Sequence, residues 1–162
     1  MHVLPLAAAL LLSAPPTPAA APAADGNQAF EKLKKLEGSW KTDAKDGPVQ
    51  YVTIRLVANG TSILETTTGA DRTAVTQVTI YAFEGSELFA TNHGSGGVSK
   101  LKVTNGAGDT LKFDGSAKDA RVASLGLVMK ESKLRQEWAT RENGREVKKS
   151  LDLLREYVDT LK

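Results

Sequence analysis

Apolar and polar residues alternate along most of the chain, which is the pattern of strands that bury one face. In the segment 49–57, Val52, Ile54 and Leu56 fall on one face, and Thr53 and Arg55 fall on the other. Asn59-Gly60 follows, and this dipeptide favours a tight hairpin turn because both residues tolerate positive φ. The pattern recurs and predicts strands at 49–57, 62–68, 74–83, 88–92, 98–104, 110–115, 122–129, 133–141 and 146–154.

Short strands joined by tight turns, at spacings of roughly 8–12 residues, are typical of an all-β meander. An open meander of about 8–10 strands would leave unpaired strand edges, and closure into a barrel removes them. We therefore expect an all-β fold with an up-and-down antiparallel barrel, in preference to a sandwich.

A short helix is expected before the first strand. Phe30, Leu33 and Leu36 recur at every third position, which places them on one face of a helix. Gly38 then breaks the helix, and Trp40 begins an extended segment. The apolar face of this helix is expected to plug one end of the barrel.

The first residues of the chain have the character of an export signal. Leu4–Leu12 is a short, mostly apolar run, and Ala21 and Ala23 supply the small residues that signal peptidase reads. The run is far shorter than the roughly 20 residues that a membrane-spanning helix needs. We expect a signal peptide at 1–23, one barrel domain at 24–162, a periplasmic or secreted protein and no membrane anchor.

Charge and cysteine content narrow the classes of function. The chain has 21 Lys and Arg, 19 Asp and Glu, and no cysteine. This near balance, without a basic stripe, argues against nucleic-acid binding. The densest basic cluster, Lys148-Lys149 beside Arg145, is interpreted as a solvated edge strand. Without cysteine, the fold cannot rely on disulfides.

Several segments together resemble a known family. They are Phe30-x-x-Leu33-x-x-Leu36-x-Gly38-x-Trp40, Ile63-Leu64-Glu65-Thr66, Thr91-Asn92-His93, Leu134-Arg135-Gln136-Glu137-Trp138 and Glu142-Asn143-Gly144. The pattern resembles the calycin superfamily and, more narrowly, bacterial lipocalin-like proteins of unknown function. The resemblance implies a closed antiparallel barrel with Trp40 packed across its closed end. It brings no established activity.

The chain departs from that family after the central histidine. Family members often carry Tyr-Cys and an Asn-Gln pair there, whereas this chain reads Gly94-Ser95-Gly96-Gly97. The segment does not match a phosphate-binding loop, because Ser99 precedes Lys100 and a strand pattern follows. We interpret it as a flexible connection at the barrel mouth that could admit a ligand.

His93 is the only histidine outside the expected signal peptide. With no cysteine to join it, it cannot complete the multi-ligand sites usual for zinc or copper. A lone histidine can ligate haem, but the haem-binding nitrobindins carry theirs late in the chain, where this sequence has none. We therefore expect no metal and no cofactor.

Glu65, His93, Gln136 and Trp138 are the candidate ligand-binding residues. On the late strand, Gln136 and Trp138 share one face, and if this face points inward they add a polar group and an aromatic wall to the lumen. The expected function is binding of a small apolar or amphipathic ligand in the lumen of the barrel, without catalysis. Two alternatives stay open: a barrel that binds a protein partner, as an inhibitor or assembly factor would, and an enzyme that uses His93 as a general base.

Overall fold

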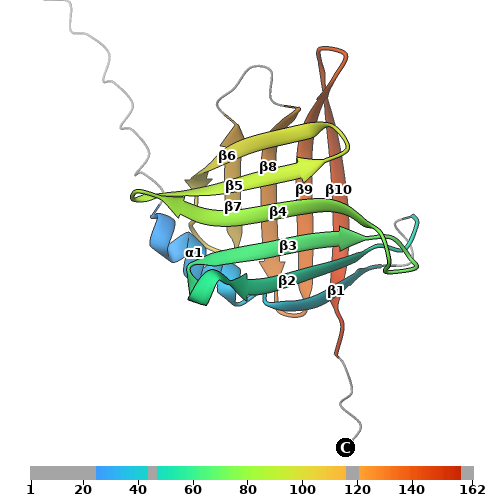
Figure 1. The fold of residues 1–162 in the computed structure, drawn as a ribbon, viewed down its shortest axis with the longest axis horizontal. Helices are drawn as coiled ribbons and strands as arrows, with labels where there is room; N and C mark the ends of the chain where they lie inside the picture. The colour runs from blue at the N-terminus through green and yellow to red at the C-terminus, as the bar shows by residue number, and fades with distance from the viewer. Residues whose placement is uncertain (1–24, 44–46, 116–120, 158–162) are drawn as a thin grey trace, which may run out of the picture.

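The fold is known from a computed structural model, which describes residues 25–43, 47–115 and 121–157. The described residues form a closed antiparallel barrel in which each strand pairs with its neighbours in sequence and β1 pairs with β10 (Figure 1). The elements are α1 (Gly26–Lys34), β1 (Gly38–Thr42), β2 (Tyr51–Val57), η1 (Ala58–Gly60), β3 (Ser62–Thr68), β4 (Val75–Glu84), β5 (Glu87–Gly94), β6 (Gly97–Asn105), β7 (Thr110–Gly115), β8 (Val122–Lys130), β9 (Lys133–Glu142) and β10 (Arg145–Arg155). The expected up-and-down barrel is confirmed. The expected signal peptide at 1–23 lies outside the described residues.

The helix begins earlier than the apolar spacing indicated, at Gly26 instead of Phe30. Asp25 is its N-cap, and Asp25 Oδ1 accepts hydrogen bonds from Asn27 N at 2.9 Å and Gln28 N at 3.3 Å. An aspartate in this position satisfies amides that the first turn leaves without partners. The capping residue therefore sets the start of the helix, and the apolar residues set only which face is buried.

Helix α1 closes one end of the barrel. Phe30, Leu33 and Leu36 are buried there and belong to the same apolar cluster as the inward-facing residues of the strands. Trp40 is 1% exposed, and its Nε1 donates a hydrogen bond to the Leu36 carbonyl at 2.9 Å. The expected plug and the expected core position of Trp40 are both confirmed.

Arg155 covers the outer side of this plug. Its guanidinium lies 4.9 Å from the centre of the Trp40 ring, and its Nη2 donates to the carbonyls of Lys35 at 2.8 Å and Glu37 at 3.0 Å. The end of β10 is thereby joined to the chain that leaves α1, because one side chain satisfies carbonyls that the helix end leaves free.

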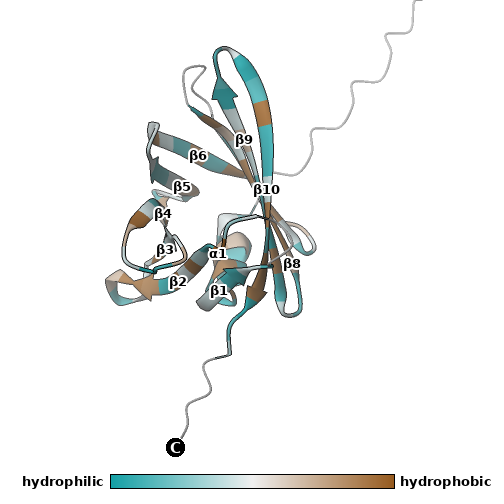
Figure 2. Cartoon of the chain, turned by 90° about the vertical axis from the view of Figure 1, so that its right-hand side faces the viewer, coloured by the Kyte–Doolittle hydropathy of each residue, from teal (hydrophilic) through white to brown (hydrophobic). Residues whose placement is uncertain are grey.

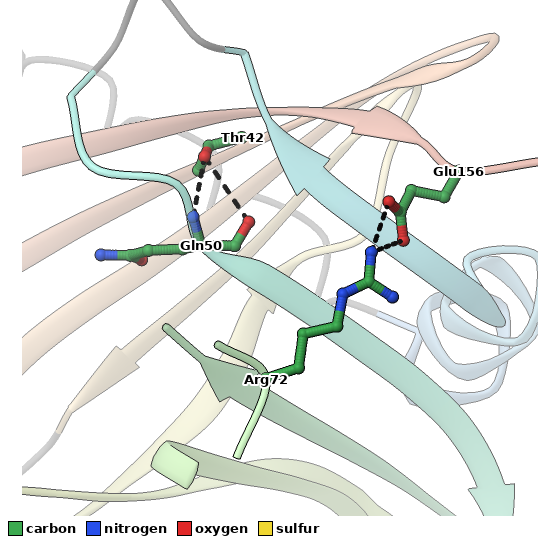
Figure 3. A network of polar contacts seen from close by, with 4 residues as sticks. All are labelled: Thr42, Gln50, Arg72 and Glu156. Carbon is green, nitrogen blue, oxygen red and sulfur yellow. Dashed lines mark hydrogen bonds and ion pairs between the residues drawn. The ribbon is translucent and has the colours of Figure 1, made fainter. Parts of the chain in front are cut away.

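Closure depends on the short strand β1. It pairs with β2 along Gly38–Lys41 and with β10 at Leu153–Arg155. Figure 3 shows two contacts beside this seam. Thr42 Oγ1 accepts a hydrogen bond from Gln50 N at 2.9 Å. Arg72 lies over the Tyr51 ring and reaches Glu156, with Nη2 at 2.8 Å from Oε1.

Replacing Trp40 by Phe is expected to destabilise the fold. The change removes the donor to the Leu36 carbonyl and leaves space in a packed interior, which together cost about 1–3 kcal/mol. Chemical denaturation followed by circular dichroism measures the loss. The matched control is Trp138→Phe, because Trp138 is only partly buried. If both variants lost the same small amount of unfolding free energy, the proposed contribution of Trp40 to the plug would be contradicted.

Candidate functional site

A cleft of about 230 Å³ lies between the β5–β6 turn, the start of β8 and the β9–β10 hairpin. These elements meet at the end of the barrel opposite α1 (Figure 1). Most of its lining is polar or glycine. The lining residues are Thr76, Gln77, Asn92, Gly94, Ser95, Gly96, Gly97, Ser99, Arg121, Val122, Trp138, Thr140, Glu142 and Lys149. The glycine-rich segment therefore lies at the mouth as expected, but as a short turn between two strands, since β5 ends at Gly94 and β6 begins at Gly97.

Arg121 crosses the rim of this cleft against the turn. A Cβ atom on Gly96 would lie 2.0 Å from Arg121 Cδ and 2.3 Å from Arg121 Nε, so a residue with a side chain could not stand there without displacing the arginine. Glycine at this position leaves room for the Arg121 side chain to lie across the turn, and a larger residue would displace only the flexible end of that arginine.

The charges at the rim favour an anion. Lys149 Nζ pairs with Glu142 Oε1 at 2.9 Å, and this hydrogen bond lowers the pKa of Glu142, with a smaller contribution from the charge of Arg121. Within the described part of the chain, the Arg121 guanidinium forms no ion pair of its own. Two cations and one carboxylate therefore meet at the mouth.

A row of buried polar side chains runs around one wall of the lumen. Glu65, Thr79, Asn92 and Ser99 are register partners on four consecutive strands, β3 to β6. All four are at most 4% exposed. Asn92 Nδ2 donates to Thr79 Oγ1 at 3.0 Å, and Ser99 Oγ accepts from Val122 N at 3.1 Å. Asn92 and Ser99 also line the cleft, so the row connects the mouth with the buried carboxyl group.

Glu65 is the only acidic side chain among the buried residues that the structure describes. Tyr81 Oη donates to Glu65 Oε2 at 2.9 Å. Burial raises the pKa of Glu65 to about 6, against the lowering effects of Tyr81 and Gln136. Burial, with the nearby Glu65, also raises the pKa of Tyr81 well above its usual value. Tyr81 therefore stays a hydrogen-bond donor to Glu65.

Gln136 lies near Glu65 but does not complete its hydrogen bonding. It acts to lower the pKa of the carboxyl group, yet neither Glu65 Oε1 nor Gln136 Nε2 has a partner within hydrogen-bonding geometry. The two groups are thus close enough to interact inside the barrel, but they do not reach full hydrogen-bonding geometry. Such a pair is unusual in a core whose only task is packing, because each group lost its water on burial.

The structure brings three of the four expected residues to this region. Gln136 is buried on the inner face of β9, as is Leu134, while Arg135 and Glu137 are exposed on the outer face. Trp138 is the next inward residue toward the mouth and lines the cleft. The expected face of the late strand is therefore confirmed. The ligand-binding role of Glu65, Gln136 and Trp138 remains a prediction.

The expected place of His93 in the lumen is wrong. His93 is exposed on the outer face of β5, where its register partners are Val78 and Val98. Strand β5 turns Leu88, Ala90 and Asn92 inward, so alternation leaves the histidine outside. The enzyme alternative that used His93 as a base inside the barrel loses its geometric support.

Several residues of the site were missed by the sequence reasoning, including Tyr81, Asn92, Ser99 and Arg121. Tyr81 and Asn92 could have been found from alternation, since both lie at the inward positions of their strands. Arg121 could not, because it precedes β8 and only the folded chain places it over Gly96.

The buried carboxyl group makes stability depend on pH. The pKa of Glu65 in the folded state, about 6, exceeds its ordinary value of 4.5. Between these values the folded state binds more protons than the unfolded state, so the free energy of unfolding falls as pH rises. The difference between the two pKa values corresponds to about 2 kcal/mol.

Replacing Glu65 by Gln is therefore expected to raise the free energy of unfolding by about 2 kcal/mol at neutral pH, and to bring no gain below the ordinary pKa of glutamate. Urea titrations at several pH values measure the effect. The control is Glu137→Gln on the exposed outer face of the same barrel. If the difference in free energy of unfolding between Glu65→Gln and the wild type stayed constant from pH 4.5 to pH 7, the raised pKa of Glu65 would be contradicted.

Other kinds of site find no support in the described residues. They hold no group of three or more His, Cys, Asp or Glu side chains that could bind a metal ion. They contain no helix long and apolar enough to cross a membrane.

Comparison with protein-family models and with curated proteins yields no match for this chain. The case for a function therefore stands on the barrel and the geometry of its mouth.

Proposed function

We propose that this protein is an exported, lipocalin-like barrel that binds one small amphipathic molecule at its mouth, without catalysing a reaction on it. One observation carries the proposal: the mouth cleft is bounded by the aromatic wall of Trp138 and by two buried polar side chains, Asn92 and Ser99. Ligand sites in proteins combine apolar or aromatic walls with a few placed polar groups, and this cleft has such a wall in Trp138 within a lining that is mostly polar or glycine.

The size of the cleft limits the ligand. Its volume of about 230 Å³ falls below the roughly 300–1,000 Å³ of pockets that take drug-sized molecules. Large buried side chains, including Trp40 and Phe113, fill the interior of the barrel beyond the cleft. We infer that the ligand is either small as a whole or inserts only one end.

The charges at the rim indicate the polar end of that ligand. Arg121 presents a guanidinium group beside the cleft, and this group binds carboxylates in a two-pronged geometry. Lys149 lies on the same rim but is already paired with Glu142. We infer a ligand with an acidic end at Arg121 and a short apolar part against Trp138.

Simple fatty acids test this proposal directly. We expect hexanoate and octanoate to bind and to change the tryptophan emission, since one of the two tryptophans of the chain lines the cleft. Hexylamine and octylamine should bind more weakly because the rim is basic. Calorimetric titration of the wild-type protein with the four compounds measures the preference.

Arg121→Gln is expected to weaken octanoate binding about 10- to 100-fold, which is what the loss of one charged hydrogen-bond donor costs. The matched control is Arg55→Gln, because Arg55 is exposed on β2 and does not line the cleft. Trp138→Phe should abolish the emission change. Equal affinity of acids and amines, or no effect of Arg121→Gln, would contradict the proposed chemistry.

A further inference from the structure

Strand β10 is much longer than the strand that closes the barrel against it. It pairs with β9 from Arg145 to Leu154, but with β1 only at Leu153–Arg155. The pairing toward β1 ends with a hydrogen bond from Asp43 N to Asp152 O at 3.1 Å. Along Arg145–Leu151, no described strand borders the other side of β10. We call this segment the free edge of β10; Figure 2 shows the upper part of the β9–β10 hairpin standing clear of β1.

Toward the free edge, the backbone groups of β10 have no partner among the residues that the structure describes. Asp152 O points toward β1, whereas Arg155 N donates to Ser132 O on the β9 side at 3.0 Å. Because the amide and carbonyl directions alternate along a strand, Glu146, Lys148 and Ser150 direct theirs to the free edge. A strand added there would find a ready row of donors and acceptors.

The side chains of the free edge determine which kind of strand can pair with it. Val147 and Leu151 are partly buried on the inner face, with Lys149 between them, and Lys148 lies on the outer face. Arg145 adds a further positive charge at the start of the strand. An added strand therefore meets two apolar positions and a basic centre.

A second copy of this chain offers the three basic residues of the edge only one acidic residue, Glu146. A symmetric antiparallel pairing centred on Lys148 would place the Lys148 side chains of both copies directly opposite each other. Like charges in that position oppose pairing, and edge lysines are a common guard against self-association. An acidic partner turns the same lysines into attractive contacts.

We propose that the free edge of β10 binds an extended acidic segment of another protein as an added antiparallel strand. In this pairing, acidic residues of the partner lie opposite Lys148 and Lys149, and apolar residues lie opposite Val147 and Leu151. The site is distinct from the small-molecule cleft except at Lys149, which borders both. The two functions can therefore be tested separately.

The test uses the full chain and a fluorescein-labelled peptide, Val-Thr-Glu-Glu-Val-Thr-Glu, read out by fluorescence anisotropy. The control peptide replaces each Glu by Lys. We expect the acidic peptide to bind, the basic peptide to fail, and added salt to weaken binding because the contacts are exposed. The double variant Lys148→Glu/Lys149→Glu should bind the acidic peptide at least about tenfold more weakly.

Proline variants separate strand addition from simple charge attraction. Lys148→Gln removes the charge at this position and keeps the amide. Lys148→Pro removes both the charge and an amide that faces the free edge, and proline is tolerated there because the barrel does not use that amide. We expect both variants to fold normally by circular dichroism, Lys148→Gln to bind the peptide more weakly than the wild type, and Lys148→Pro to lose it. Lys149→Pro removes an amide directed at β9 and should destabilise the barrel itself.

If Lys148→Pro does not fold, the same question is put to the wild-type chain with N-methylated peptides. Methyl groups on the amides that face β10 should abolish binding, and methyl groups on the alternate amides should not. Three results would overturn the proposal: no binding of the acidic peptide, equal binding of the basic peptide, or binding that is indifferent to which amides are methylated. A dimer in sedimentation that Lys148→Pro dissociates would also overturn it, in favour of self-pairing.

Discussion

The whole structure depends on β1 pairing on both of its sides. This five-residue strand joins β2 to β10, and without it the sheet would have two open edges and no enclosed interior. Trp40, the central residue of β1, faces inward and binds the Leu36 carbonyl through Nε1. Arg155, the register partner of Trp40 on β10, lies over the Trp40 ring. Strand closure, helix plug and core are thus one cooperative unit at the closed end.

The same closure explains why the other end is available for binding. Because β1 is short, it closes β10 only at its C-terminal residues. The upper part of β10 and the β9–β10 hairpin extend beyond it and border the mouth (Figure 2). Polar residues gather in this half of the lumen, where Glu65, Asn92 and Ser99 are buried with Tyr81. A barrel built only for packing would fill these positions with apolar side chains, since buried polar groups gain little over the water they lose.

Much of the fold could be predicted from the chain, and less of the site. Alternation found the strands, and the face shared by Leu134 and Gln136 is inward as expected. The placement of His93 was wrong because this residue was chosen for its chemistry. Alternation along β5 turns Asn92 inward and therefore leaves His93 on the outer face. The start of the helix was also missed, because Asp25 acts through capping and not through the apolar spacing.

The sequence by itself determined which residues alternate, where the turns lie and which helical face is apolar, since these are local properties of neighbouring residues. It also marked Lys148-Lys149 as an edge strand, and the pairing of β10 agrees. Only the tertiary structure decided that Glu65 meets Tyr81 and Gln136, and that Arg121 lies over Gly96. These contacts join residues far apart in the chain, and their distances depend on the register and closure of the entire barrel.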